Sequence, residues 1–231
     1  MKVVAIGTGY VGLVTGVCYA SLGHDVVCLD IDSGKIDALN KGHSPIFEPG
    51  LEELMAQAVQ DGLLHFSTDY ASTLANADVA IIAVGTPTEE GGSKANTSFV
   101  DAAFRSILEH QSGELTVVVK STVPIGTNDR LQRWLDQETT KAPIHLASNP
   151  EFLREGAAIS DFMKPDRIVV GPRDEKAASD LRRLNQSFID QGQAYVEVSA
   201  ASAEMIKYAA NAFLATKITF INEVASLCER V

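Results

Sequence analysis

The sequence predicts an α/β fold with a doubly wound, mostly parallel sheet and helices on both faces, followed by one long α-helix. Apolar runs and amphipathic stretches alternate as far as Pro150, which is typical of repeated βα units. A glycine pattern, Gly7-Thr8-Gly9-Tyr10-Val11-Gly12, separates the first apolar run from the first helical stretch. The last 33 residues contain neither glycine nor proline.

Continuous apolar runs predict strands that are buried on both faces of the sheet. We expect them at Lys2–Ile6, Asp25–Leu29, Asp78–Val84, Leu115–Val119 and Ile144–Ala147, with a weaker one at Leu64–Phe66. The amphipathic stretches predict helices near Val11–Leu22, Ser33–Asn40, Gly50–Gln60, Tyr70–Ala75, Ser98–Glu109 and Gly126–Glu138.

Beyond Pro150 the pattern changes. It predicts a short helix and then a strand, a helix and a strand that can extend the sheet, at Arg167–Val170, Glu175–Phe188 and Ala194–Val198. Apolar residues in Ser199–Val231 recur near helical spacing, so we expect one long helix there. We therefore divide the chain into an α/β domain, residues 1–198, and a long helix, residues 199–231.

Composition and charge limit the class of partner. The chain has a net charge of −11, with 45% apolar and 21% charged residues, which is typical of a soluble globular protein. So acidic a chain repels nucleic-acid phosphates, and we expect no nucleic-acid partner. No apolar run approaches the length of a membrane span and no basic leader precedes the first strand, so we expect neither membrane insertion nor a signal peptide.

The three cysteines, Cys18, Cys28 and Cys228, lie in apolar periodic stretches, and none forms a C-x-x-C pair. We therefore expect buried free thiols, no metal site, and a reducing, cytoplasmic location.

The glycine pattern has the full context of a Rossmann-like dinucleotide site, because the strand Lys2–Ile6 leads into it and an apolar helix follows at once. Gly7 permits the tight turn, Gly9 lets the backbone approach a pyrophosphate, and Gly12 lets the helix pack closely on the strand. The pyrophosphate then meets the N–H groups at the helix N-terminus.

Asp30 ends the next strand, 18 residues after Gly12. A carboxylate there accepts a hydrogen bond from the ribose 2′-hydroxyl and repels a 2′-phosphate, so we predict NAD rather than NADP. A plain turn residue is the alternative for Asp30. Lys35 lies just past the strand, where it can contact the adenosine ribose or remain solvated.

Hydroxyl side chains follow two further strands at the edge of the sheet where ligands bind. Thr86 follows the fourth strand, and Ser121 and Thr122 follow the fifth. They can contact cofactor or substrate, and helix capping is the alternative for each.

The run from Asn149 to Gly156 follows the sixth strand. Asn149 fits a helix N-cap and Pro150 fits the first helical position, which would place Glu151 and Glu155 one turn apart on one face. Two carboxylates at this edge can do acid–base work if burial raises one pKa. The alternative is that acids in a first helical turn simply favour the helix dipole.

Lys207 and Asn211 stand four residues apart on the long helix, and therefore on one face. An ammonium and a carboxamide that point together at a substrate oxygen stabilise developing negative charge. A solvated lysine and a surface asparagine are the alternative.

These motifs together resemble those of the nucleotide-sugar 6-dehydrogenases, most closely the members that oxidise UDP-glucose. The resemblance spans the whole chain, and its most specific stretches are Asn149–Gly156 and Asp161–Gly171, which reads Asp-Phe-Met-Lys-Pro-Asp-Arg-Ile-Val-Val-Gly. The other matching stretches are Gly7–Gly12, Asp30 with Lys35, Phe47–Leu51, Val84–Thr88, Lys120–Gly126 and Glu204–Asn211.

The resemblance implies oxidation of the sugar C6 alcohol of UDP-glucose, through the aldehyde level, to the carboxylate of UDP-glucuronate, with two NAD molecules. It also implies a place in polysaccharide biosynthesis and a homodimer formed through residues 199–231. Thr122 would position a water or proton, Glu151 would assist thioester hydrolysis, Glu155 would lie where cofactor and sugar meet, and Lys207 with Asn211 would stabilise the oxyanion. The implied NAD contacts are Tyr10, Val11, Asp30, Lys35, Thr86, Ser121 and Thr122, with Glu155, and the implied sugar-nucleotide contacts are Phe152, Leu153 and Arg154, with Glu151, Glu155, Lys207 and Asn211.

The sequence departs from the family pattern in one respect. The resemblance implies a covalent catalytic cysteine in a Gly-rich motif beyond the long helix, followed by a UDP-binding domain, and these 231 residues contain neither. None of the three cysteines matches that motif. We therefore expect these residues to bind NAD and to form an incomplete sugar-nucleotide site that does not turn over.

Three alternatives stay open at this point. A β-hydroxyacid or 6-phosphogluconate-type dehydrogenase shares the Lys–Asn spacing, although it would carry a Gly-rich loop in place of Asn149–Gly156. GDP-mannose and UDP-N-acetylhexosamine are alternative substrates. A non-catalytic NAD-binding interaction module would fit the missing cysteine motif and the acidic surface.

Overall fold

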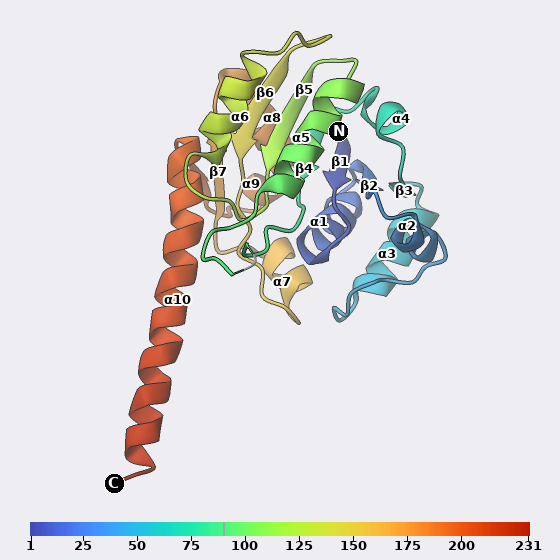
Figure 1. Cartoon of the computed structure of the whole chain (residues 1–231). Helices are drawn as coiled ribbons and strands as arrows, with labels where there is room; N and C mark the ends of the chain where they lie inside the picture. Colours follow the sequence, from blue (N-terminus) through green and yellow to red (C-terminus); the bar gives the residue numbers. More distant parts are fainter. Residues whose placement is uncertain (90) are drawn as a thin grey trace.

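The computed structural model describes residues 1–89 and 91–231. Its strands are β1 (Lys2–Ile6), β2 (Asp25–Leu29), β3 (Leu64–Ser67), β4 (Val79–Ile82), β5 (Leu115–Val119), β6 (Ile144–Ser148), β7 (Ile168–Pro172) and β8 (Tyr195–Glu197). They form one sheet in the order β3-β2-β1-β4-β5-β6-β7-β8, in which only β6 and β7 pair antiparallel (Figure 1). The order reverses between β1 and β4, which opens a ligand crevice at the carboxyl ends of the strands. The predicted doubly wound, mostly parallel sheet is confirmed.

The helices of the described residues are α1 (Tyr10–Ser21), α2 (Ser33–Asn40), α3 (Leu51–Gln60), α4 (Tyr70–Leu74), α5 (Ser98–His110), α6 (Thr127–Leu135), α7 (Ala158–Met163), α8 (Glu175–Leu184), α9 (Gln186–Asp190) and α10 (Ala200–Cys228). Successive strand residues point to opposite faces of a sheet, so two cores form. Val3 and Ala5 of β1 pack in one core with α1, α2, α3, α7, α8 and α9. Val4 and Ile6 pack in the other with α4, α5 and α6.

The glycine turn lets α1 lie close against β1. Gly7 has a φ of +97°, in the region that glycine adopts without strain. A Cβ added to Gly12 would lie 1.9 Å from the Gly7 carbonyl oxygen, so only glycine fits there. The backbone therefore has the tight turn predicted at Gly7 and the close helix packing predicted at Gly12.

The helix predicted at Glu175–Phe188 is in fact two helices, α8 and α9, with a break at Asn185. Asn185 is buried, and its amide donates to the Leu181 carbonyl and accepts from the Tyr19 hydroxyl. An asparagine side chain that bonds the nearby backbone competes with the helical ladder, which explains the break.

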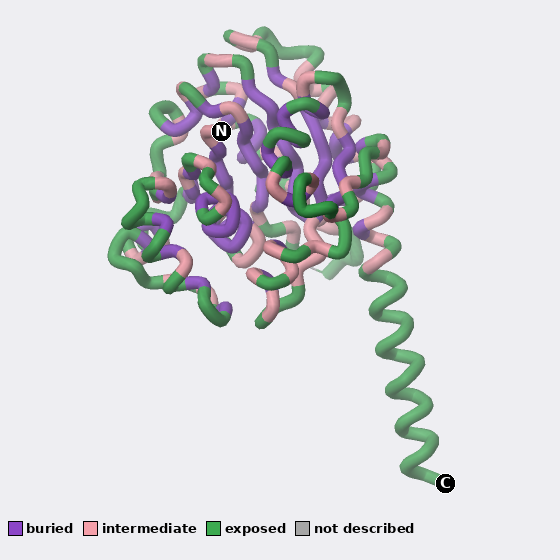
Figure 2. The backbone as a smooth tube through the Cα atoms, turned by 180° about the vertical axis from the view of Figure 1, so that it is seen from behind, coloured by how far each residue is buried: buried purple, intermediate pink, exposed green. Residues whose placement is uncertain are grey.

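The long helix predicted at Ser199–Val231 is confirmed as α10. The Ser199 hydroxyl accepts from the Ser202 N–H and caps its start. The first two turns bury Ala203, Glu204 and Lys207 against the body, and the helix is exposed throughout from Asn211 onward (Figure 2). Within residues 1–89 and 91–231, no helix has the length and apolar character that crossing a bilayer requires.

The cysteine prediction is correct for two of the three positions. Cys18 and Cys28 are buried in the core as free thiols, and burial raises the pKa of each to about 12. Cys228 is a free thiol too, but it is exposed, because the apolar spacing around it belongs to the part of α10 that leaves the body.

Gly171 should be intolerant of a side chain because β7 and α10 touch there through their backbones. An added Cβ would lie 2.6 Å from Ala200 Cα and 2.9 Å from the Ser199 carbonyl oxygen. Gly171→Ala should lower the free energy of unfolding by about 1–3 kcal/mol, measured by urea denaturation. Gly113→Ala is the matched control, since its nearest atom would be 3.8 Å away. Equal unfolding curves for the two variants would contradict the tight contact.

Candidate functional site

The glycine loop, residues 7–12, joins β1 to α1 at the switch point of the sheet. Gly9 is the N-cap of α1, which has no side-chain cap and no acid in its first turn, so its terminal N–H groups and positive dipole end are available to an anion. A Cβ on Gly9 would meet no atom within 4 Å, so the surface of the loop is open to a close ligand. These features fit the pyrophosphate of a dinucleotide.

Asp30 lies beside the glycine loop and is 9% exposed. Its Oδ2 accepts from the N–H and the hydroxyl of Thr8, both at 2.7 Å, and its Oδ1 accepts from the Asp32 N–H at 3.0 Å. Burial acts to raise the pKa of Asp30, but these hydrogen bonds outweigh it and hold the pKa below its usual value. Lys35 Nζ is 3.9 Å from Oδ2. An ionised carboxylate with spare lone pairs therefore stands where a ribose hydroxyl would need an acceptor.

The hydroxyl residues after β4 and β5 bridge the two loops and cap no helix. Ser121 Oγ donates to the Val84 carbonyl at 2.7 Å, and Thr86 Oγ1 donates to the Thr122 carbonyl at 2.7 Å. Thr122 itself is half-buried. The capping alternative is therefore wrong for Ser121 and Thr86, whose bonds fix the shape of the crevice beside the glycine loop.

The helix predicted to begin at Asn149 does not form, and α7 begins only at Ala158. The Asn149 amide is buried and engaged at both ends: Nδ2 donates to the Val169 carbonyl at 2.8 Å, and Oδ1 accepts from Lys120 Nζ at 3.1 Å. An amide held by β7 and by Lys120 cannot cap a helix. The asparagine instead ties the carboxyl ends of β5 and β6 to β7.

The two predicted carboxylates are consequently not one helical turn apart. Glu155 is exposed, whereas the Glu151 side chain is 11% exposed and pairs with Lys207. Lys207 Nζ donates to Glu151 Oε1 at 2.7 Å, and Glu151 Oε2 accepts from the Leu153 N–H at 2.6 Å. The structure therefore joins the loop to α10 through a pair of nearly buried charges.

Aromatic and cationic side chains surround that pair. The Phe152 ring lies close to two cations: the Arg167 guanidinium is 4.5 Å from its centroid, and Lys207 Nζ is 5.5 Å from it. Asn211, one turn beyond Lys207 on α10, is exposed. An ion pair, a flat apolar ring and an amide on one side of the crevice can bind a polar sugar and stabilise a developing oxyanion.

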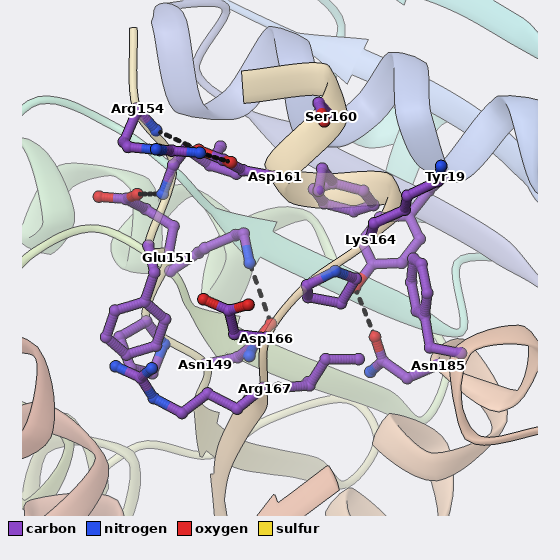
Figure 3. A pocket seen from close by; sticks show the side chains of 18 residues that line it. Tyr19, Asn149, Glu151, Arg154, Ser160, Asp161, Lys164, Asp166, Arg167 and Asn185 are labelled. Atoms are coloured by element: carbon purple, nitrogen blue, oxygen red, sulfur yellow. Dashed lines mark hydrogen bonds and ion pairs between the residues drawn. The ribbon is translucent and has the colours of Figure 1, made fainter. Parts of the chain in front are cut away.

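A cavity of about 470 Å³ lies beneath the Asn149–Gly156 loop, lined by eighteen side chains (Figure 3). Arg154 holds Asp161 at its rim through three hydrogen bonds, two from its guanidinium, of 2.7 and 3.0 Å, and one from its backbone N–H, of 2.9 Å. The Tyr19–Asn185 hydrogen bond closes its other side. The cavity thus lies between the predicted substrate loop and the core that α1, α7 and α9 share.

Lys120 is a buried member of this site that the sequence analysis did not single out. It is 5% exposed and lines the cavity, and its only apparent signal is a charge at the end of the apolar strand β5. Burial lowers the pKa of Lys120 to about 8; Lys207 acts in the same direction and Glu151 opposes it.

Glu48 is a second residue that the sequence analysis left without a role. It is buried, and its carboxylate accepts from the Tyr10 hydroxyl and from the N–H groups of Gly156 and Ala158, each of the latter at 2.8 Å. It lies in the matching stretch Phe47–Leu51, but its role could not be read there because its partners lie far away along the chain. In the part of the chain that the structure describes, no group of three His, Cys, Asp or Glu side chains could hold a metal ion.

Comparison with known proteins identifies related chains. The model of the UDP-glucose/GDP-mannose dehydrogenase family, NAD binding domain, matches residues 1–189, and that of the family's central domain matches residues 201–231. A UDP-glucose 6-dehydrogenase of Rhizobium meliloti (strain 1021) is 51% identical over 233 residues, which cover 100% of this chain and 53% of that protein. A second, from Bacillus subtilis (strain 168), is 53% identical over 232 residues, which cover 100% of this chain and 52% of that protein.

Solved structures agree with these relatives. A UDP-glucose dehydrogenase from Pyrobaculum islandicum superposes with a TM-score of 0.90 at 42% identity, over 96% of this chain and 51% of that one. A GDP-mannose dehydrogenase from Pseudomonas aeruginosa superposes with a TM-score of 0.89 at 35% identity, over 96% of this chain and 52% of that one. The chain therefore spans about half the length of the relatives it matches.

Lys120 should make stability depend on pH above neutrality. Its folded pKa, about 8, lies below the 10.5 of an ordinary lysine, so between these values the unfolded chain binds the proton more tightly. The contribution of Lys120 to the free energy of unfolding should therefore rise with pH over that window, by at most about 1.4 kcal/mol per pH unit. Urea denaturation at several pH values should show the rise in the wild-type chain but not in Lys120→Met. A constant difference between the two would contradict this prediction.

Proposed function

The chain belongs to the UDP-glucose/GDP-mannose dehydrogenase family, and on that premise we propose that it supplies the cofactor side of the NAD-dependent oxidation of UDP-glucose at C6 to UDP-glucuronate. The observation that carries this proposal is the Glu151–Lys207 pair, which stands at the carboxyl edge of the same sheet that presents the glycine loop. Acid–base and oxyanion groups thereby lie on the side of the crevice where a hydride acceptor binds.

The cofactor side is formed by the loops after β1, β2, β4 and β5. NAD, when bound, supplies the hydride acceptor. The glycine loop, residues 7–12, holds the pyrophosphate with the N–H groups at the start of α1, including those of Tyr10 and Val11. Asp30 accepts from the adenosine ribose and excludes a 2′-phosphate, with Lys35 beside it. Thr86, Ser121 and Thr122 line the crevice further along the sheet.

The substrate side is formed by the Asn149–Gly156 loop and α10. Lys207 stabilises negative charge on the C6 oxygen, and Asn211 joins it from the next turn. Glu151, tied to Lys207, is placed to exchange protons with a water near C6, together with Thr122. Exposed Glu155 faces the boundary between cofactor and sugar. Phe152, Leu153 and Arg154 contact the sugar nucleotide.

The covalent thiol that the family uses is not supplied by these 231 residues. Cys18 and Cys28 are buried in the core. Cys228 follows Lys207 by 21 residues on one continuous helix, which places it about 30 Å away along the axis. The thioester steps therefore need a thiol from outside this sequence, and the sugar-nucleotide site that the sequence forms is incomplete.

Domain division, assembly and location are part of the same proposal. Residues 1–198 form the NAD-binding domain, and residues 199–231 begin the connecting helix. The exposed apolar residues Phe213, Ile218 and Val224 on α10 suit pairing with a second copy of the chain. Two buried free thiols suit a reducing, cytoplasmic location, and the uronate product suits polysaccharide biosynthesis.

The open alternatives are weighed by the comparisons. Family membership argues against a β-hydroxyacid-type enzyme. UDP-glucose is preferred over GDP-mannose because two relatives named for UDP-glucose are 51% and 53% identical to this chain over the aligned residues, against 35% for the GDP-mannose dehydrogenase. A non-catalytic NAD-binding module would fit the missing cysteine motif and the acidic surface, but the intact Glu151–Lys207 pair favours the catalytic function.

Asp30 should set the choice of cofactor. The wild-type chain should bind NAD at least tenfold more tightly than NADP, and Asp30→Ala should lose about 1.5–3 kcal/mol of NAD binding and most of that discrimination. Calorimetric titration with each dinucleotide measures both effects. Asp37→Ala, an exposed acid on α2, is the matched control and should behave like the wild type. Equal wild-type affinities for NAD and NADP would contradict the assigned role.

Turnover by these residues alone should be absent. A polypeptide of the 231 residues, given UDP-glucose and NAD, should bind NAD and form no UDP-glucuronate, because none of its three thiols reaches the Glu151–Lys207 pair. Chromatographic detection of the uronate checks this, with a full-length relative as positive control. Uronate formed by the 231-residue chain would show that the chemistry runs without an external thiol.

A further inference from the structure

Glu48 joins segments that lie far apart along the chain. It belongs to the connection between α2 and α3, directly before Pro49, and it is 6% exposed. On one side it faces Tyr10, the first residue of α1 and part of the glycine loop. On the other side it faces Gly156 and Ala158, where the Asn149–Gly156 loop runs into α7. The buried Glu48 carboxylate therefore lies between the glycine loop and the Asn149–Gly156 loop.

One oxygen of Glu48 is shared between the two loops. Oε2 accepts from the Tyr10 hydroxyl and, at 2.8 Å, from the Gly156 N–H, which also lies 3.1 Å from the Tyr10 oxygen. Tyr10, Glu48 and Gly156 therefore close a triangle of hydrogen bonds. These bonds connect the position of Tyr10 to the position of Gly156.

The other oxygen anchors α7. Oε1 accepts from the Ala158 N–H at 2.8 Å, at a helix start whose N-cap residue, Ala157, provides no side-chain cap. Glu48 thus does for α7 what a capping side chain usually does. The donors to both oxygens are neutral groups, so the bonds are charge-assisted by the carboxylate alone.

At neutral pH, the Tyr10 hydroxyl remains a hydrogen-bond donor and the Glu48 carboxylate remains an acceptor. Burial, together with the Glu48 carboxylate, raises the pKa of Tyr10 to about 12, so the hydroxyl stays a donor. Burial acts to raise the pKa of Glu48, but its hydrogen bonds lower it overall, so the carboxyl stays an acceptor.

We propose that Glu48 is a positioning residue that couples dinucleotide binding at the glycine loop to the order of the Asn149–Gly156 loop, through the Tyr10–Glu48–Gly156 triangle. The inference rests on the proposed function of these two loops. Occupancy of the glycine loop steadies Tyr10, Tyr10 steadies Glu48, and Glu48 holds the end of the loop that carries Glu151 and Arg154. The cofactor would thereby prepare the sugar side of the crevice.

If Glu48 only stabilised the fold, a different result would follow. Its hydrogen bonds would protect the Gly156 and Ala158 amides equally with and without the dinucleotide, and replacing Glu48 would raise their exchange rates equally in both states. Coupling requires that NAD slow exchange at these amides, and that the slowing depend on Glu48 and Tyr10. The discriminating quantity is therefore the ratio of exchange rates without and with NAD, not the rate itself.

Amide hydrogen exchange of the 231-residue chain, followed by NMR at Gly156 and Ala158, measures that ratio. Saturating NAD, with saturation checked by titration for every variant, should slow exchange by about tenfold in the wild type. In Glu48→Gln, which keeps the side-chain size but removes one acceptor oxygen, the ratio should fall to about one. In Tyr10→Phe the ratio at Gly156 should also fall to about one, while Ala158 in the NAD-free chain keeps its protection through Oε1.

Glu53→Gln is the matched control, since it removes an exposed acid from the same segment and should preserve the wild-type ratio. A ratio near ten that survives in both Glu48→Gln and Tyr10→Phe would overturn the coupling, as would a wild-type ratio of one at saturating NAD. In both cases NAD binds, so the proposed cofactor function stands. A wild-type chain that does not bind NAD would overturn both proposals together.

Discussion

The close contact between α1 and the turn that precedes it is the constraint on which the rest of the site depends. Gly12 lies so near the Gly7 carbonyl that any side chain would force the helix outward. With the helix held there, its N-terminus opens directly onto the crevice between β1 and β4. The same crevice is reached by Asp30 after β2, Thr86 after β4 and Ser121 after β5. They meet there because the carboxyl ends of parallel strands lie at one edge of the sheet. The predicted cofactor residues converge through backbone geometry alone.

The Asn149–Gly156 loop is held in place by charged side chains rather than by the hydrogen bonds of a helix or strand. Although the chain is strongly acidic overall, Lys120, Lys207, Arg154 and Arg167 come together around the Asn149–Gly156 loop. A buried charge needs a partner, and the two buried lysines therefore fix loop groups: Lys207 fixes Glu151, and Lys120 fixes Asn149. Arg154, an exposed residue of the loop itself, binds Asp161 of α7. A loop without helical hydrogen bonds is thus held in one shape, beside a group of cations.

Local pattern sufficed wherever a residue's role follows from its own neighbours along the chain. The glycine turn, Asp30 at a strand end and the helical spacing of α10 are such cases, and the structure bears out their placement. Local pattern failed at Asn149, whose sequence context reads as a helix cap. The competing partners there, Lys120 and the Val169 carbonyl, are 29 and 20 residues away in sequence, and they reach Asn149 only because β5, β6 and β7 are neighbours.

The sequence by itself therefore determined the doubly wound sheet, the glycine turn with Asp30 at the end of the next strand, and the long helix, because periodicity and short motifs encode local backbone geometry. Only the tertiary structure decided which charges meet. Lys207 lies 56 residues from Glu151, and Glu48 lies 38 and 108 residues from Tyr10 and Gly156. No short window contains such pairs. Burial makes these contacts strong, and burial is a property of the assembled sheet and helices rather than of any segment alone.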